Sequence, residues 1–447
     1  MSLQLVQLTL PSPHEHASPI GTENQSFNAE YRIIETPVGP HIFIADQSRL
    51  YAIDNALSHS ESELHRALGE LIVLNEERAI GLAPIAVPPL HSLSLNVAQA
   101  CNMACSYCYA DEGRFGGKAR LMSEEIAFRS IDRLLSEAAE GEPVVVGFMG
   151  GEPMLHRELV HAATRYAASH CGEREVRFSL TTNGTLLNAC DVQLFHEFPF
   201  TVQISIDGDR ESNDLARPML GGGSSYDRII ESLKLFSIHG RPKQLSARVT
   251  VTPLTRDLPS VLRHVMSLGF DDVGFAPVVV SPNLSTSFSS RDFESFLADM
   301  IACGRIALDE LKNGRPFPFT NFLTAIDEIH KGTHRPYPCG AGAAYLSVNA
   351  EGEVYACHRL IDDPAFAMGN VRTGLDQESR SKLLARMHVD RMEPCRGCWA
   401  RYLCGGGCYH EVTRRGRLGC DYIRGWIEFC ISAYAELSSS NQYTHFS

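Results

Sequence analysis

Residues 101–108 read Cys-Asn-Met-Ala-Cys-Ser-Tyr-Cys and place three cysteines, Cys101, Cys105 and Cys108, on one short segment. An apolar stretch at 91–97 precedes them, so the spacing C-x₃-C-x₂-C predicts a tight loop directly after a strand. Three thiolates on such a loop can hold three corners of a [4Fe–4S] cube, which leaves the fourth iron open to a ligand other than cysteine. Zinc is the alternative, but structural zinc sites usually take four protein ligands arranged in C-x₂-C pairs.

Around this loop, the stretch 91–280 alternates between strand patterns and helix patterns. The predicted strands are 91–97, 143–149, 175–182, 201–206, 244–251 and 272–280, and the predicted helices lie near 123–139, 156–170, 188–197, 225–239 and 258–268. Strand–helix units in series predict a parallel sheet with right-handed crossovers. Six units without a seventh or eighth predict an α/β fold, an open partial (β/α)₆ TIM barrel, with ligands at the carboxyl ends of the strands.

The cysteine loop resembles the hallmark of the radical S-adenosylmethionine (SAM) superfamily. Three further motifs of that family follow successive predicted strands: Gly150-Gly-Glu152-Pro, Thr182-Asn183-Gly184 and Ser205-Ile-Asp207-Gly208. The resemblance implies that the residues contacting SAM are Tyr107, Gly150, Gly151, Glu152, Asn183, Ser205, Asp207 and Arg217. Each later motif alone resembles an ordinary turn, and their order at consecutive strand ends is what makes them informative.

The resemblance also implies a chemistry. SAM would chelate the open iron through its amino and carboxylate groups, with Glu152 pairing the ammonium and Arg217 the carboxylate. Gly150 and Gly151 would let the backbone approach the ligand closely. One electron from the cluster would cleave SAM into methionine and a 5′-deoxyadenosyl radical, which abstracts a hydrogen atom from the substrate. The protein would orient the reactants and exclude water.

A second cysteine array lies after position 330, where eight of the chain's 14 cysteines are found. Its spacing, C-x₁₂-G-x₄-C followed by C-x₂-C-x₅-C-x₃-C and a final cysteine, resembles closely the SPASM domain, which houses two auxiliary [4Fe–4S] clusters. The resemblance implies an inner cluster on Cys339, Cys357 and Cys408 and a distal cluster on Cys395, Cys398, Cys404 and Cys420. Two zinc sites are the alternative for this array.

Two ligand assignments in the array stay open. Some members of the family have a fourth cysteine between the first two, but none lies between Cys339 and Cys357 here, so the inner cluster is expected to have an open iron or a ligand from elsewhere. Cys430 competes with Cys420 as the last distal ligand; the Gly-rich turn before Cys420 favours the latter.

His358 and Asp362 are candidate catalytic residues because they follow Cys357 closely and could move a substrate proton. His410 is a further candidate, and for all three the alternative is a hydrogen-bonded residue beside a cluster. Sulfatase-maturing relatives place a catalytic aspartate directly after the cysteine that corresponds to Cys357. His358 stands there instead, which weighs against formylglycine formation.

The rest of the chain divides by composition. We expect an irregular tail at 1–30, a small α+β module at 31–89, the barrel at 90–285, a helical linker at 286–335, the auxiliary-cluster domain at 336–435 and a tail at 436–447. The module's three short strands and a helix from 63 to about 75 resemble part of a leader-peptide-binding domain; a structural cap on the barrel is the alternative. Because 336–425 is poor in long apolar periods, we expect it to fold around bound metal.

Composition limits the partners. The chain has 447 residues, 44% hydrophobic and 21% charged, with a net charge of −13. Nucleic-acid binding is disfavoured because phosphate contacts need clustered Lys and Arg. No apolar run reaches the ~18 residues of a membrane span, and no signal peptide is evident, so a cytoplasmic enzyme without a membrane partner is expected.

Auxiliary clusters imply an oxidative bond on a peptide or protein substrate, with a flavodoxin- or ferredoxin-type protein as electron donor. The tail, Cys408-Tyr-His-Glu411 and Cys420-Asp-Tyr-Ile-Arg-Gly-Trp426, resembles maturases of quinohemoprotein amine dehydrogenase, which join cysteine sulfur to a carbon of Asp or Glu. A thioether in a Cys-containing peptide is therefore favoured over a carbon–carbon cyclophane or formylglycine. An iron–sulfur carrier or scaffold is the non-enzyme alternative, but it would need neither the Gly-Gly-Glu-Pro motif nor six strand–helix units.

Overall fold

The computed structural model of the chain describes residues 4–5, 31–55, 62–64, 66–68 and 86–439. Its centre is a run of six parallel strands, in the spatial order β11-β10-β9-β8-β7-β5. Their bounds are β5 Ser92–Gln99, β7 Val144–Gly150, β8 Val176–Thr182, β9 Phe200–Ser205, β10 Gln244–Val251 and β11 Asp272–Pro277. The predicted open barrel of six strand–helix units is confirmed.

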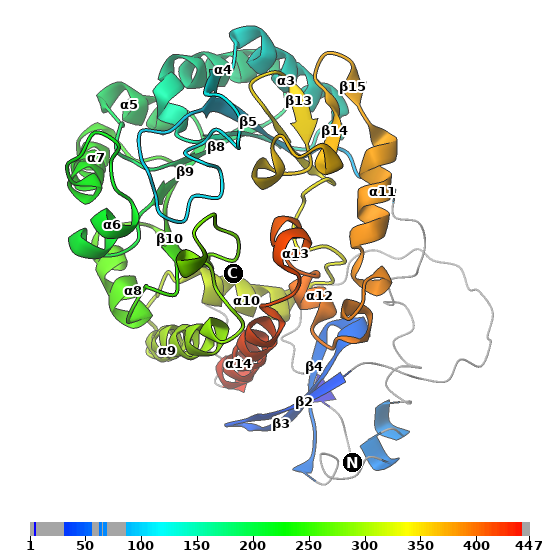
Figure 1. Cartoon of the computed structure of the whole chain (residues 1–447). Coiled ribbons are helices and arrows are strands. Elements are labelled where there is room, and N and C mark those ends of the chain that lie inside the picture. The colour runs from blue at the N-terminus through cyan, green and yellow to red at the C-terminus, as the bar shows by residue number, and fades with distance from the viewer. Residues whose placement is uncertain (1–3, 6–30, 56–61, 65, 69–85, 440–447) are drawn as a thin grey trace.

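Helices ring the outside of these strands (Figure 1). They are α3 Glu124–Glu137, α4 Arg157–His170, α5 Ala189–Glu197, α6 Arg210–Ala216, α7 Ser225–His239 and α8 Leu258–Ser267. The Ser123 side chain caps α3 by accepting a hydrogen bond from the backbone N–H of Ile126, as its sequence predicts. The short helix α6 was not predicted; it begins after Asp209, whose side chain accepts from the N–H of Ser212. Seven residues are too few for a clear apolar period.

The cysteine-rich segment continues the same sheet. β12 (Tyr345–Val348) pairs in parallel with β5, and β13 (Glu353–Tyr355), β14 (Ala367–Asn370) and β15 (Gly374–Leu375) follow as antiparallel strands. Leu346, Val348 and Phe366 belong to the same hydrophobic core as the barrel strands. The expectation that 336–425 has little core of its own is therefore corrected for its first half, which packs on the barrel.

The second half of 336–425 has little regular secondary structure, as expected for a segment with a small core of its own. After α11 (Gln377–Met387) come only short turns of helix, η7 Val389–Arg391, η8 Cys395–Gly397, α12 Arg401–Cys404 and α13 Tyr409–Arg415. Four of the auxiliary-set cysteines lie in these elements or directly at their ends, Cys395, Cys398, Cys404 and Cys408. Helices this short are not stable alone, so their positions depend on what they pack against or bind.

Long helices fill the expected linker and the end of the described chain. α9 (Asp292–Lys312) and α10 (Thr320–Lys331) both pack against α14 (Cys420–Ser439). Cys303 on α9 and Cys430 on α14 are fully buried in the main hydrophobic core. The helix α14 runs to Ser439, past the boundary at 435 where a tail was expected, because its apolar face still packs on this core.

The small N-terminal sheet has the order β1-β4-β3-β2, with β2 at Tyr31–Thr36, β3 at Gly39–Ile44 and β4 at Arg49–Ala52. β1 (Gln4–Leu5) lies in the stretch expected to be irregular, which is a correction: its backbone pairs with the otherwise free edge of β4. Residues 62–64 and 66–68 are helical, and the rest of the helix expected up to 75 lies outside the described residues. The ring of Phe43 meets Trp399 edge-on at 6.1 Å, so the sheet contacts the cysteine-rich segment.

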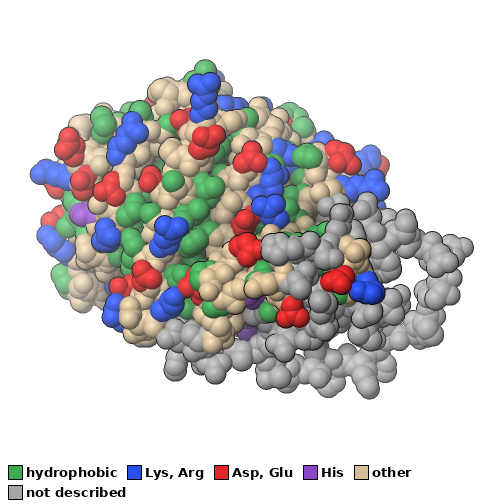
Figure 2. Space-filling view, turned by 90° about the horizontal axis from the view of Figure 1, so that it is seen from below, with side chains coloured by type: hydrophobic (Ala, Val, Ile, Leu, Met, Phe, Trp, Pro, Cys, Tyr) green, Lys and Arg blue, Asp and Glu red, His purple; other side chains and the backbone are tan. Residues whose placement is uncertain are grey.

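Acidic and basic side chains are interspersed over the described part of the face in Figure 2. Such mixing is typical of a solvated surface rather than of a polyanion-binding face. Among the residues that the structure describes, no helix combines the length and the apolar character that crossing a bilayer requires.

Gly150 and Gly151 allow the loops at the strand ends to pack closely against each other. A side-chain carbon on Gly150 would collide with the carbonyl oxygen of Ala98, and one on Gly151 would collide with the carbonyl of Ala100 and with Gly113. These neighbours belong to β5 and to the loop after it, which carries the three cysteines. The structure thus gives these glycines a packing reason, different from the close approach to a ligand expected from the sequence.

Gly151→Ala should therefore destabilise the protein by about 1–3 kcal/mol, the usual cost of overpacking against rigid backbone. The midpoint of thermal unfolding should fall relative to the wild type at the same scan rate. Gly221→Ala is the matched control, because a side-chain carbon there would meet nothing within 4 Å. An unchanged midpoint for Gly151→Ala would contradict this packing account.

The two halves of the cysteine-rich segment should also differ in their dependence on metal. In protein prepared without iron, limited proteolysis should cut within 388–420 first, while β12–β14 stay protected by the sheet that they share with the barrel. The cut sites can be read by mass spectrometry, and reconstitution with iron and sulfide should slow them. Equal resistance with and without iron would show that this half is not organised by metal.

Candidate active site in the barrel

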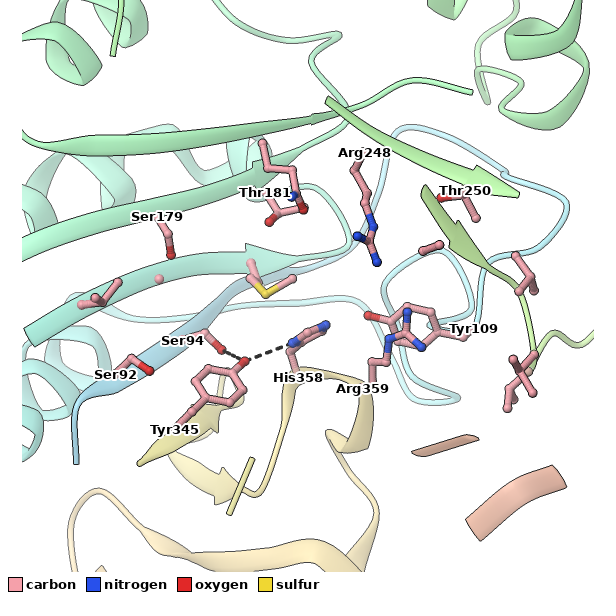
Figure 3. Close-up of a pocket in the computed structure, with 18 of the residues that line it drawn as sticks. Ser92, Ser94, Tyr109, Ser179, Thr181, Arg248, Thr250, Tyr345, His358 and Arg359 are labelled. Atoms are coloured by element: carbon pink, nitrogen blue, oxygen red, sulfur yellow. Dashed lines mark hydrogen bonds between the residues drawn. The ribbon is translucent and has the colours of Figure 1, made fainter. Parts of the chain in front are cut away.

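The barrel encloses a cavity of about 630 Å³. Its walls come from the strands, from the loop after β5 and from the cysteine-rich segment, so residues far apart in the sequence face one another (Figure 3). The polar and aromatic lining residues include Ser94, Tyr107, Tyr109, Ser179, Thr181, Gln203, Arg248, Thr250, Tyr345, His358 and Arg359. A cavity of this size and mixed lining suits a bound small molecule together with part of a second reactant.

The first cysteine loop borders this cavity through Tyr107 and Tyr109. Burial raises the pKa of Cys101 to about 12, with a smaller contribution from the Glu152 carboxylate. Burial likewise raises the pKa of Cys105 to about 11. Both thiols are therefore protonated without metal, and binding of a metal centre would release their protons.

A buried carboxylate lies beside this loop. Glu152 is fully buried and accepts hydrogen bonds from the Thr182 hydroxyl at 2.7 Å and from the backbone N–H of Asn183 at 2.7 Å. The Asn183 amide in turn donates to Asn102 Oδ1 at 2.9 Å and lies 3.8 Å from Cys101 Sγ. Burial raises the pKa of Glu152, and its hydrogen-bond donors in the described chain are all neutral. A ligand ammonium would supply the missing cation.

A second network flanks the loop on the side of Cys105. The Tyr107 hydroxyl donates to Asp207 Oδ2 at 2.5 Å and accepts from Arg217 Nη1 at 2.5 Å. The backbone N–H of Thr250 donates to Asp207 Oδ1 at 2.8 Å. Arg217 Nε is buried and has no hydrogen-bond partner among the described residues. This guanidinium therefore keeps one donor free for an anionic ligand group, although Asp207 and Tyr107 already hold its other end.

The remaining SAM-contact candidate, Ser205, is half-buried at the end of β9. Its Cα is paired with that of Arg248 on β10, so both residues stand at the same level of the barrel. Of the eight predicted contact residues, only Tyr107 lies on the cavity wall itself; Glu152, Asn183, Asp207 and Arg217 lie behind it in the two networks.

The distal set of cysteines surrounds a separate cavity of about 110 Å³, lined by Cys395, Cys398, Cys404, Cys408 and Cys420. Burial raises the pKa of Cys395 to about 11, and the thiols of Cys404, Cys420 and Cys398 act in the same direction. Cys430 does not line this cavity and lies in the hydrophobic core. The structure thus brings Cys420, not Cys430, to the other three.

The inner set lies near Tyr109 on the wall of the active-site cavity, and His358, the residue after Cys357, lines that cavity. Burial raises the pKa of Cys357 to about 12, and the neighbouring thiols of Cys339 and Cys408 add to this effect. Tyr109 lies near both cysteine systems: after burial, Cys357, Cys108 and Cys408 all help to raise its pKa. No group of three or more His, Cys, Asp or Glu side chains in the described ranges is placed to hold a single metal ion.

The two candidate catalytic residues differ in position. His358 lines the cavity, and its Nδ1 lies 3.0 Å from the Tyr345 hydroxyl, which is 2.7 Å from Ser94 Oγ (Figure 3). Burial, with the positive charge of Arg359 next, lowers the pKa of His358 to about 3.

Asp362 lies off the cavity wall and accepts hydrogen bonds from Gln99 Nε2 at 3.0 Å and Asn349 Nδ2 at 2.8 Å. It therefore joins the end of β5 to the turn after β12, and the structure brings only His358 to the cavity. His410 lies beside Tyr109, with ring centres 5.7 Å apart.

Several lining residues were missed from the sequence. Arg248 is the one charged residue within β10, a signal that could have marked it as an inward-facing charge. Arg359 lies over the Tyr109 ring at 5.3 Å and donates to Glu411 Oε1 at 2.8 Å. Tyr345 gave no sequence signal, because its place depends on β12 joining the barrel sheet.

Iron–sulfur clusters are held by cysteine thiolates, and the chain offers three sets of cysteines. In the two networks, within the described part of the chain, the Glu152 carboxylate has only neutral hydrogen-bond donors and Arg217 Nε has no partner, so together they could bind a zwitterion such as SAM. The residues present therefore fit both groups. Cys101, Cys105 and Cys108 would hold the first cluster, with SAM between Glu152 and Arg217.

Comparison with known proteins agrees with this chemistry. The family model of the radical SAM superfamily matches residues 95–263, and that of the SPASM iron–sulfur cluster-binding domain matches residues 339–399. The chain is 25% identical over 369 residues to the serine-type anaerobic sulfatase-maturating enzyme of Klebsiella aerogenes, covering 76% of this chain and 85% of that enzyme.

Solved structures show the same fold. The structure of anSMEcpe with bound AdoMet matches with a TM-score of 0.68 at 22% identity, covering 79% of this chain and 96% of that one. Streptococcus suis SuiB bound to the precursor peptide SuiA matches with a TM-score of 0.52 at 14% identity, covering 87% and 96%. The chain is a modifying enzyme of the radical SAM superfamily that uses SAM and [4Fe–4S] clusters and carries a SPASM domain after its barrel.

Proposed function

We propose that this enzyme carries out an oxidative modification of a peptide or protein substrate in the 630 Å³ cavity, and that the product is a thioether between cysteine sulfur and carbon. One observation carries the proposal. Tyr109 on the cavity wall lies next to both cysteine systems, Cys108 of the first loop and Cys357 and Cys408 of the inner auxiliary set. A substrate in this cavity is therefore close to both a hydrogen-abstracting centre and an electron acceptor.

The chain's own groups would arrange the first reactant. Bound together, the first cluster and SAM supply one-electron chemistry that abstracts a hydrogen atom. Glu152 would hold the ammonium of SAM and Arg217 Nε its carboxylate. The Tyr107 hydroxyl, which donates to Asp207 and accepts from Arg217, keeps these two residues in place. The low exposure of these groups excludes water from the reacting atoms.

The inner auxiliary set supports the thioether. Cys339, Cys357 and Cys408 are three thiols where a cube takes four ligands, and a substrate thiolate is the natural fourth. Forming the link removes the thiol proton and one hydrogen atom of a C–H bond, and one electron leaves the substrate. Accepting that electron is the role that the auxiliary clusters would supply.

Formylglycine formation is the second candidate, because the Klebsiella relative is a sulfatase-maturating enzyme. That reaction oxidises a single side chain and forms no cross-link. His358 on the cavity wall stands where the sequence resemblance expects an aspartate in such enzymes, which is why we place it second. The carbon–carbon cyclophane is weaker still, since it would leave the three-thiol set without a substrate ligand.

Mass spectrometry of a Cys-containing substrate peptide distinguishes these products. After anaerobic reaction with SAM and dithionite, a thioether loses two hydrogens, resists reductant and no longer reacts with a thiol-alkylating reagent. Formylglycine instead reacts with a hydrazide, and a cyclophane leaves the cysteine open to alkylation. As control, a variant with Cys101, Cys105 and Cys108 all replaced by Ala should release no 5′-deoxyadenosine. A product whose cysteines all remain alkylatable would reject the thioether.

The distal cluster can be tested by iron content. Cys420→Ala should lower the iron bound after reconstitution by up to one cluster, about four irons, because Cys420 lines the cavity with the other distal cysteines. Cys430→Ala is the matched control on the same helix and should keep the full iron content, although it loses core packing. Reversed results for the two variants would assign the ligand to Cys430.

A further inference from the structure

Arg248 carries a charge into the active-site cavity from the middle of β10. On the adjacent strand its Cα is paired with that of Gly274, which has no side chain that could bind the guanidinium. Figure 3 shows this guanidinium pointing toward Tyr109 and Arg359 rather than outward. Within the described residues, its side chain makes neither a hydrogen bond nor an ion pair.

The charged groups near Arg248 do not neutralise its positive charge. Arg359 brings a second cation, and Glu411, the one carboxylate among the described residues that acts on Arg248, accepts a hydrogen bond from Arg359 at 2.8 Å. On its other side Arg248 borders a smaller cavity, where Glu328 Oε2 already lies 3.6 Å from Arg335 Nε. Two guanidiniums therefore share one carboxylate at the cavity, and the unpaired one is Arg248.

Burial and the charge of Arg359 lower the pKa of Arg248 to about 10, so it remains a cation at neutral pH. A partly buried cation without a protein partner is less well solvated than one in bulk water, and a bound anion would recover that free energy.

We infer that Arg248 binds a carboxylate of the substrate, so that an aspartate or glutamate side chain enters the cavity together with the residue that is modified. This inference rests on the proposed function only in taking the substrate to be a peptide. A planar guanidinium can hold a carboxylate through two parallel hydrogen bonds, which fixes position as well as charge. Arg248 would thus set both which segment binds and how it lies against Tyr109 and His358.

A binding experiment tests this without turnover. The reconstituted enzyme with SAM but no reductant is titrated by anaerobic calorimetry with two probe peptides, acetyl-Gly-Cys-Gly-Glu-Gly-amide and its Gln counterpart. The wild type should bind the Glu peptide about ten times more tightly, as expected for one charged hydrogen-bonded pair. Arg248→Gln should bring the ratio near one, and Arg248→Lys should keep part of it. Arg177→Gln, an exposed residue paired with Glu175, is the control and should keep the full ratio.

Two outcomes would overturn the inference. A wild type with no preference for the Glu peptide would do so without any variant, so a variant that fails to fold does not block the test. A large loss of SAM affinity in Arg248→Gln would assign Arg248 to the SAM carboxylate instead. The wild type could also prefer the Glu peptide but form no modified product after reductant is added. That result would support the role of Arg248 and contradict the proposed function, so the two claims can fail separately.

Discussion

The parallel pairing of β12 with β5 is the interaction on which the active site depends. It places Ser347 against Ser94, whose hydroxyls lie 2.8 Å apart, and brings the Tyr345 hydroxyl within 2.7 Å of the same serine. His358 and Arg359 follow from this placement, because they come directly after the hairpin that β12 begins. Without this pairing the barrel would be open on the side of β5, and the inner auxiliary cysteines would have no fixed distance from the first loop.

The cavity and the two networks behind its wall hold charged groups that the protein pairs only in part. Glu152 is buried among neutral donors, Arg217 keeps a free Nε, and Arg248 has no anion of its own. Burial of such groups is costly unless a ligand completes them, and a site that binds zwitterionic and acidic ligands accepts that cost in the free protein. At Gly150 and Gly151, by contrast, the protein leaves no room for a further group, because the strand-end loops pack so closely that no side chain fits.

The sequence predicted what is local. Six strands, their helices and the cysteine sets could be predicted, because each depends on periodicity or spacing within a few residues. It did not reveal that β12 extends the barrel, since strand pairing across 250 residues leaves no local pattern. Tyr345 and Arg359 were missed for the same reason. Asp362 was singled out by nearness to Cys357, yet its carboxylate is occupied by Gln99 and Asn349.

The choice between Cys420 and Cys430 shows how geometry decides what spacing leaves open. Both lie on α14, and ten residues of helix separate them by about 15 Å along its axis and by about 80° around it. They therefore cannot serve the same cavity. Cys420 begins the helix, where the partial positive charge of the N-terminus favours a thiolate, whereas Cys430 is enclosed by apolar side chains that disfavour one. Packing of α14 against α9 and α10 thus fixes one cysteine as core and leaves the other at the edge of the distal set.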